Sequence, residues 1–321
     1  KEFEKLKFLV PGVEEQTKIA EFITNINLKI DQLKQKKSLL EQYKKGVMQK
    51  LFSQELRFKD ENGKEFPKWE KKKLGEIYSF KATNSYSREN LNYELGDIKN
   101  IHYGDIHTKF QVQFDITKEL VPFINPEIST ERILADNYCK EGDLVIADAS
   151  EDYADVGKSI EIINLNQEKT VAGLHTILAR PDLKVIHIGF GGFVMKSNDI
   201  RKQIMLMAQG TKVLSISANR LGSIDIILPS KQEQAKIANF LSAIDDKINH
   251  CQKQIEKTET EIQNIETESA NLERILSSSE KLDDHSIFAK YELVKSKLKT
   301  AMEEWEKQHE ELENWKLKKN W

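Results

Sequence analysis

The chain has few of the features that mark several large protein classes. Its 321 residues include only two cysteines, Cys139 and Cys251. That number excludes a disulfide framework and is typical of a reducing compartment such as the cytoplasm. No apolar run approaches the ~18 residues that a membrane-spanning helix needs, and we find no signal-peptide pattern. The net charge is −3, so a nucleic-acid-binding surface would have to be local or completed by a partner.

Motifs that indicate an enzyme are also missing. There is no G-x-x-x-x-G-K-[ST] loop for ATP. Residues 184–193 (KVIHIGFGGF) are rich in glycine but do not match the dinucleotide-binding pattern, and we interpret them as a strand followed by a tight turn into a helix. The nearest approach to an adenine methyltransferase motif, Asn125-Pro126-Glu127, lacks the second proline. Histidines and cysteines have no zinc-like spacing. We therefore predict a non-catalytic chain that itself binds no metal or cofactor.

What the sequence does contain is one segment written twice. Residues 10–30 (VPGVEEQTKIAEFITNINLKI) and 228–248 (LPSKQEQAKIANFLSAIDDKI) align at a fixed offset. The identical pairs are Pro11/Pro229, Glu15/Glu233, Gln16/Gln234, Lys18/Lys236, Ile19/Ile237, Ala20/Ala238, Phe22/Phe240, Ile26/Ile244, Lys29/Lys247 and Ile30/Ile248. Repeats this far apart are not a short-period solenoid, whose units recur every ~20–50 residues. They indicate one module held between two equivalent arms.

Both copies begin long helical patterns. After Pro11, apolar residues recur at three- and four-residue steps through Leu51, and the second arm keeps the same alternation from Ile237 to Leu276. Such spacing is typical of a coiled-coil seam. A 40-residue helix is about 60 Å long, which is longer than the core of one domain requires. We therefore predict spacer helices over 12–56 and 230–276 that pair with each other or with another chain.

The segment between the arms has a different composition and pattern. A polar linker, 57–73, carries turn signals at Asn62-Gly63 and Phe66-Pro67. Residues 74–229 then contain short β-branched and aromatic runs broken by glycine, asparagine and aspartate, together with a helical stretch near 193–208. The predicted fold class is α+β, with one mixed domain and long antiparallel coiled-coil helices. Residues 1–11 are predicted to end a preceding element, and 277–321 to form a coiled-coil tail.

Several segments resemble one family. The stretch 56–77 (LRFKDENGKEFPKWEKKKLGEI) is similar to the junction before the second target-recognition domain in specificity subunits of type I restriction–modification systems, and 228–248 resembles the start of their distal helix. Blocks 103–106, 141–158, 172–177 and 209–217 resemble parts of those domains. The family has two recognition domains and this chain has one, so it is similar to a half-subunit or a C-terminal portion. The tail, EEWEKQHEELE at 303–313, is weakly similar to the coiled coil of ABC-F ATPases.

The resemblance implies a function and a set of partners. The domain at 74–229 would read one half of a bipartite DNA target, and the helices would set the spacing. Expected partners are double-stranded DNA, methyltransferase subunits, a restriction/translocase subunit, and a second copy or another half-subunit, all in the cytoplasm. S-adenosylmethionine, ATP and Mg would belong to partner subunits. Glu15, Gln16, Glu233 and Gln234 would begin the helices that dock methyltransferase subunits.

Four loops carry side chains suited to reading DNA, because amide, basic, hydroxyl and acidic groups contact base edges and phosphates. They are 81–90, 102–109, 148–153 and 209–220, with His175 beside them. The candidate residues are Lys81, Asn84, Ser85, Tyr86, Arg88, Tyr103, His107, Lys109, Ser150, Glu151, Asp152, His175, Gly210, Thr211, Lys212, Ser215, Asn219 and Arg220. Two alternatives remain open: a coiled-coil scaffold that binds protein rather than DNA, and an inactive recombined fragment.

Overall fold

A computed structural model describes residues 12–277, and the predictions made for 1–11 and for the tail beyond Ser277 lie outside the described residues. The chain divides into two compact units, one of residues 42–246 and one that contains the outer parts of the two long helices. These helices are α1 (Val13–Phe52) and α7 (Lys231–Ser277). Within residues 12–277, no helix is both long and apolar enough to cross a membrane.

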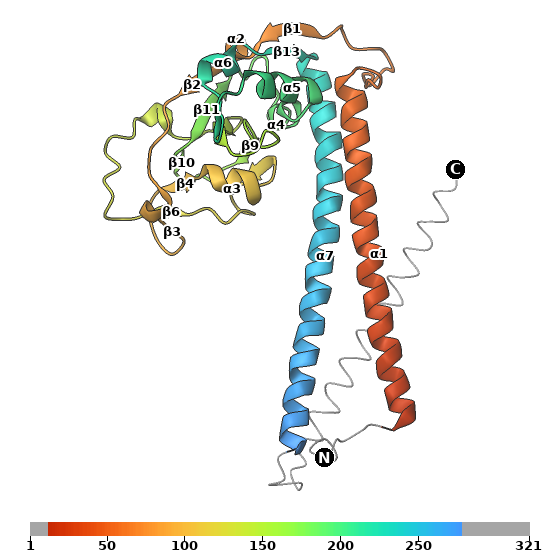
Figure 1. Ribbon diagram of the computed structural model, residues 1–321. Helices are drawn as coiled ribbons and strands as arrows, with labels where there is room; N and C mark the ends of the chain where they lie inside the picture. The colour runs from red at the N-terminus through yellow and green to blue at the C-terminus, as the bar shows by residue number, and fades with distance from the viewer. Residues whose placement is uncertain (1–11, 278–321) are drawn as a thin grey trace. The chain divides into compact units, whose positions relative to one another are not determined.

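In each unit, α1 and α7 run side by side in opposite directions (Figure 1). In the outer unit, Lys34 pairs with Glu259 at 2.9 Å, and Ile30 lies buried, as do Cys251 and Ile255. In the unit of residues 42–246, Lys44 pairs with Asp245. The buried residues there are Val47 and Leu51 of α1 and Ile237, Leu241 and Ile244 of α7. The apolar spacing read from the sequence therefore forms the antiparallel contact between the helices.

The mixed domain between the helices is built on a five-stranded sheet in the order β2-β11-β7-β9-β5, antiparallel except for the β5–β9 pair. A second sheet has the order β10-β4-β6-β3. The bounds of the first sheet are β2 Tyr78–Lys81, β11 Thr176–Pro181, β7 Leu144–Ala147, β9 Ser159–Asn164 and β5 Gln113–Asp115. Those of the second are β10 Thr170–Ala172, β4 Lys99–Ile101, β6 Phe123–Ile124 and β3 Leu91–Asn92. The predicted α+β class is confirmed.

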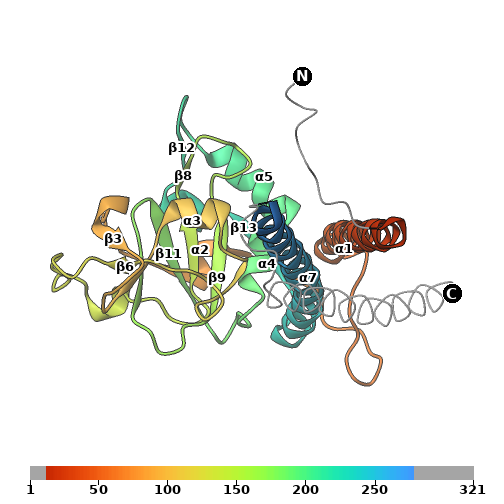
Figure 2. The same cartoon turned by 90° about the horizontal axis from the view of Figure 1, so that it is seen from below.

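Two short strand pairs and several short helices complete the domain. The pair β1–β13 joins its two ends in antiparallel register, with Glu70 opposite Leu228, and the pair β8–β12 lies at another edge (Figure 2). The strand bounds are β1 Glu70–Lys73, β8 Ala149–Ser150, β12 Leu214–Ser215 and β13 Asp225–Leu228. The helices are α2 Leu74–Ile77, η2 Arg88–Asn90, α3 Tyr103–Thr108, η3 Ala135–Asn137, α4 Gly191–Met195, α5 Asn198–Met207 and α6 Ala218–Gly222.

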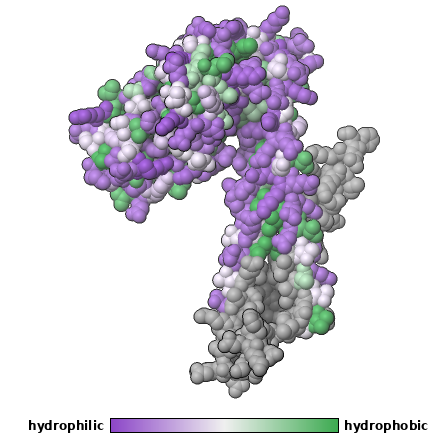
Figure 3. Space-filling model, in the orientation of Figure 1, coloured by the Kyte–Doolittle hydropathy of each residue, from purple (hydrophilic) through white to green (hydrophobic). Residues whose placement is uncertain are grey.

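The core lies between the sheets and the helices. Val145, Ile160, Ile162 and Leu178 of the central strands are fully or almost fully buried and pack with Phe114 and other apolar side chains. The four residues of β7 are all buried, which explains why its sequence is a continuous apolar run rather than an alternating one. By contrast, the face of the domain seen in Figure 1 is mainly hydrophilic, with small separate apolar areas (Figure 3).

The predicted strand at 184–190 is wrong, because these residues form turns before α4. The backbone N–H groups of Val185 and Ile186 donate to the carbonyl oxygen of Asp182. The Gln234 side chain accepts from the backbone N–H of His187 at 2.9 Å and donates to the carbonyl oxygen of Val185 at 3.0 Å. A side chain from α7 thus satisfies backbone groups that a neighbouring strand would otherwise pair.

Candidate nucleic-acid interface

The first two predicted loops are joined through Asp105, a buried residue of α3. Its carboxylate accepts from the Arg88 guanidinium at 2.8 Å and pairs with the Lys109 ammonium at 2.9 Å. Burial would raise the pKa of Asp105, but the hydrogen bonds from Arg88 and Lys109 outweigh it and lower that pKa overall. The side chains of Arg88 and Lys109 are 44% and 52% exposed. Asp105 therefore anchors two cations at the surface without removing them from solvent.

An aromatic and imidazole cluster continues this surface. The Tyr103 ring lies 4.7 Å from the His102 ring and 5.4 Å from the His175 ring, centroid to centroid. Burial and the nearby Arg88 charge lower the pKa of His102, which keeps its ring neutral near pH 7. Nδ1 of that ring accepts from the backbone N–H of Gly104 at 3.1 Å. His175, at φ 54°, places its Nδ1 3.4 Å from the Asp148 carboxylate.

The second loop contacts the third through backbone groups. The His107 ring nitrogen Nε2 lies 3.1 Å from the carbonyl oxygen of Ala149, and the Lys158 ammonium donates to the carbonyl oxygen of His107. The first loop is tied to the strand before His175 by Asn84, whose amide donates to the carbonyl oxygen of Ala172 at 2.9 Å. Segments distant in sequence are thus brought together at one surface.

The third and fourth loops form a two-stranded ribbon. In the antiparallel β8–β12 pair, Leu214 lies opposite Ser150 and Ser215 opposite Ala149. The fourth loop closes on itself, because Gln209 and Ser215 exchange two backbone hydrogen bonds at 2.8 and 2.9 Å. Gly210 sits at φ 136°, and a Cβ there would lie 1.9 Å from the carbonyl oxygen of Val213. Only glycine fits this turn.

Most candidate residues on these loops reach solvent, but some have internal roles. The exposed ones are Ser85, Arg88, Lys109, Glu151, Asp152, His175, Gly210, Thr211, Lys212, Ser215 and Asn219, and the partly exposed ones are Asn84, Tyr103, His107 and Ser150. The Tyr86 hydroxyl donates to the carbonyl oxygen of Ser129, and its ring packs on a small apolar cluster. The Arg220 guanidinium donates to the carbonyl oxygen of Met207 at 3.0 Å. Tyr86 and Arg220 therefore help to shape the loops.

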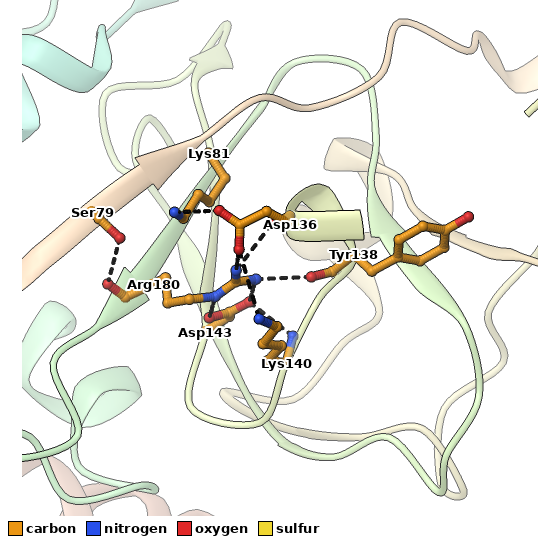
Figure 4. A network of polar contacts seen from close by, with 7 residues as sticks. All are labelled: Ser79, Lys81, Asp136, Tyr138, Lys140, Asp143 and Arg180. Atoms are coloured by element: carbon orange, nitrogen blue, oxygen red, sulfur yellow. Dashed lines mark hydrogen bonds and ion pairs between the residues drawn. The ribbon is translucent and has the colours of Figure 1, made fainter. Parts of the chain in front are cut away.

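Lys81 belongs to an ionic network with Asp136, Asp143 and Arg180 (Figure 4). Its ammonium lies 2.6 Å from the Asp136 carboxylate. The Arg180 guanidinium bridges Asp136 and the buried Asp143 and also donates to the carbonyl oxygen of Tyr138. The Lys81 side chain is only 22% exposed. The Lys81 ammonium is therefore engaged in this network and largely shielded from solvent.

Two of the predicted docking residues are internal. Glu233 is 0% exposed, and its carboxylate accepts from the Arg57 guanidinium at 2.6 and 3.0 Å and from the Trp69 indole N–H at 3.1 Å. Gln234 is 1% exposed and bonds to the backbone around 185–187 and to the Pro229 carbonyl oxygen. Their prediction as partner-docking side chains is corrected, because no partner can reach them. Glu15 and Gln16 lie in α1, but their side chains are outside those described.

Glu161 explains the glycine-rich turn that was considered as a cofactor loop. This buried carboxylate accepts from the backbone N–H groups of Gly189 and Gly192, at 2.7 Å each. Burial raises the pKa of Glu161 to about 7, although these backbone hydrogen bonds oppose the rise. The amide groups that a phosphate would need are therefore occupied by the chain itself. Within residues 12–277, no group of three or more His, Cys, Asp or Glu side chains could hold a metal ion.

Sequence reasoning missed Arg57, Trp69 and Arg201. Arg201 of α5 donates to the carbonyl oxygens of Ala154 and Val156 at 3.0 and 2.8 Å. Arg57 and Trp69 lie in the linker that the sequence marked only as polar. The sequence feature that could have revealed Arg57 and Trp69 is that both are hydrogen-bond donors on the segment that precedes the domain.

Residues 67–259 match the model of the type I restriction modification DNA specificity domain. The chain is 28% identical over 268 residues to the type I restriction enzyme MjaVIII specificity subunit of Methanocaldococcus jannaschii, covering 80% of this chain and 59% of that protein. It is 27% identical over 266 residues to the putative MjaX specificity subunit of the same organism, covering 79% and 56%.

Two solved structures are also similar. The S subunit of the type I restriction–modification system of M. genitalium aligns with a TM-score of 0.46 at 14% identity, over 74% of this chain and 51% of that one. The HsdS subunit of Thermoanaerobacter tengcongensis aligns with a TM-score of 0.43 at 14% identity, over 76% and 54%. The chain thus spans little more than half the length of the relatives it matches. Because the family model covers more than half of its residues, this chain belongs to the type I restriction modification DNA specificity domain family.

Proposed function

We propose that this chain reads a DNA sequence within a type I restriction–modification complex. The observation that carries the proposal is that four loops, lying between residues 81 and 220, are joined by contacts into one surface of the domain. That surface offers guanidinium, ammonium, amide, hydroxyl and imidazole groups. These are the groups that contact phosphates and base edges in protein–DNA complexes. Family membership supports the same conclusion.

In this proposal the domain reads one half of a bipartite target, and the two long helices set the distance to the other half-site. Successive turns of B-DNA repeat about every 10–10.5 bp, so a change in helix length would appear as a change in the spacer. Methyltransferase subunits, a restriction subunit and a second half-subunit are the proposed partners. S-adenosylmethionine, ATP and Mg would bind to those partners, and this chain would itself catalyse no reaction. The complex would act in the cytoplasm.

The proposal is tested by reconstituting the full chain with a type I methyltransferase subunit and mapping methylated adenines in a host that expresses both. We expect methylation at one bipartite sequence. Duplex affinity should fall with salt, with a log–log slope of about −0.9 per phosphate contact. Methylation without sequence preference, or no binding to duplex even at low salt, would favour a protein-binding scaffold instead.

A matched pair of variants tests whether the four-loop surface contacts DNA. Lys212→Glu reverses an exposed charge on the fourth loop, and Lys169→Glu reverses an exposed charge outside the four loops. We expect Lys212→Glu to weaken duplex binding at least tenfold and to reduce the salt slope by about 1, because one phosphate contact is lost. Lys169→Glu should bind within twofold of the parent. Equal losses for both variants would contradict the assignment of the four-loop surface.

A further inference from the structure

Arg201 of α5 holds a turn that belongs to a different part of the domain. Its Nη2 donates to the carbonyl oxygens of Ala154 and Val156 at 3.0 and 2.8 Å. The turn rests directly on α5, since a Cβ at Gly157 would lie 2.7 Å from Cγ2 of Ile204. Gly157 itself has φ 68°, a backbone conformation that side chains other than glycine rarely adopt. The turn 151–157 is therefore held in place by α5, the helix that carries Arg201.

The turn also holds its own shape. The Asp152 carboxylate accepts from the backbone N–H of Ala154 at 2.8 Å, and the Ser150 hydroxyl accepts from the backbone N–H of Asp152 at 3.0 Å. The carbonyl oxygen of Asp152 accepts from two further backbone N–H groups at 3.1 Å. Glu151 and Tyr153 are left exposed, Tyr153 to 55%. A surface turn this strongly determined presents a set arrangement of side chains to a partner.

The register of the ribbon places a second turn beside the first. Ser150 is followed by the turn 151–157, and its partner Leu214 is preceded by the turn 209–213. Because the strands are antiparallel, both turns lie at the same end of the ribbon. This tip, the exposed residues 151–154 and 210–213, combines Glu151 and Asp152 on one side with Thr211 and Lys212 on the other. The two loops therefore approach a ligand as one element.

The width of the groove and the charge of the tip both favour the major groove of DNA. The major groove is about 12 Å wide and admits a two-stranded ribbon, whereas the minor groove is about 6 Å wide. The carboxylates of the tip also favour the major groove. Cytosine and adenine present amino donors to a carboxylate in the major groove, whereas the narrow minor groove of A-tracts has an enhanced negative potential that attracts basic side chains. The tip is thus suited to the major groove.

We propose that the tip of the β8–β12 ribbon enters the major groove of the target and that Arg201 is a positioning residue for this readout. The inference rests on the proposed function in DNA recognition. Arg201 acts through the turn 151–157 and does not itself touch a base. Its loss should therefore change which bases are accepted without removing the phosphate contacts that hold the duplex.

The test uses the full chain with its methyltransferase partner and maps methylated sites for four variants. Arg201→Ala removes the fork that holds the turn, and Arg201→Lys keeps the charge with fewer donors. Glu151→Gln changes only the exposed tip, and Lys202→Ala is the control, an exposed cation at the next position of α5. We expect Arg201→Ala to lose at least tenfold in methylation of the parent sequence and to accept other bases at one position, with partial rescue by lysine. Glu151→Gln should relax the same position, and Lys202→Ala should match the parent.

A second measurement tests the groove. Inosine in place of guanine in the recognised half-site removes amino groups from the minor groove and leaves the major-groove face unchanged. We expect duplex affinity to stay within twofold, and a loss of tenfold or more would overturn major-groove entry. The inference would be overturned if both Arg201→Ala and Glu151→Gln directed methylation to the same sites as the parent chain. It would also be overturned if these variants bound less methyltransferase subunit on co-elution but kept the parent's site preference. If the unmodified chain directs no sequence preference at all, the proposed function fails instead.

Discussion

Removing Arg57 tests the joint that ties the linker to the start of α7. Arg57→Ala leaves the carboxylate of Glu233, which is 0% exposed, with the Trp69 indole as its remaining side-chain donor. Breaking a buried ion pair by removing one partner typically costs about 3–5 kcal/mol. The Arg57 side chain is 24% exposed, so water can replace part of the lost hydrogen bonding. We therefore expect a loss of about 2–3 kcal/mol in the free energy of unfolding.

The assays are urea unfolding for the free energy and thermal unfolding for the Tm, both followed by far-ultraviolet circular dichroism. For a domain of about 200 residues, this loss corresponds to a decrease of roughly 4–12 °C in Tm. The double variant Arg57→Ala/Glu233→Ala should lose less than the sum of the two single variants, because it leaves no unpaired buried charge. Lys71→Ala is the control: it breaks an ion pair with Asp225 in which the lysine is 66% exposed, and should cost at most about 0.5 kcal/mol. Additive losses in the double variant would refute the reasoning.

Three further predictions concern the same domain. Glu161→Gln should lower stability by about 2 kcal/mol in thermal unfolding, because its amide N–H₂ would face one of the two backbone donors now bound; an unchanged Tm would contradict this. Because burial raises the pKa of Glu161 to about 7, stability should fall as pH rises from about 4.5 to 7, and Glu161→Gln should remove that part of the pH dependence. Gly210→Ala should lower the melting temperature by roughly 2–12 °C, because a Cβ would lie 1.9 Å from the backbone carbonyl oxygen of Val213 and the turn must rearrange, and it should reduce duplex binding at least tenfold; parental binding would show that the shape of this turn is unimportant.

The sequence predicted the features that repeat or have a period. The long helices follow from apolar residues at three- and four-residue steps, and the antiparallel pairing of Lys34 with Glu259 fits the predicted arms. The duplicated segment correctly drew attention to Glu233 and Gln234 but not to what they do. Glu233 is satisfied by Arg57, 176 residues away, and no local pattern reveals a partner at that distance.

For the loops, too, some features could be predicted from the sequence and others could not. Turn residues such as Gly210 could be predicted to form loops from composition alone. That the third and fourth loops would pair into one ribbon depended on the register of β8 and β12, which contain only two residues each. Residues 184–190 were predicted as a strand because they are apolar, yet their backbone groups are bound by the Gln234 side chain. Tertiary partners decide such short segments.

The antiparallel pairing of β1 with β13 has a consequence for how such proteins diversify. It brings the two ends of the mixed domain next to each other, with Glu70 opposite Leu228, and Arg57, Trp69 and Glu233 lock the segments just outside that pair. The four loops proposed to read DNA all lie between these two ends. Under the proposed function, a different insert between these ends would change the recognised sequence and leave the attachment to the helices intact.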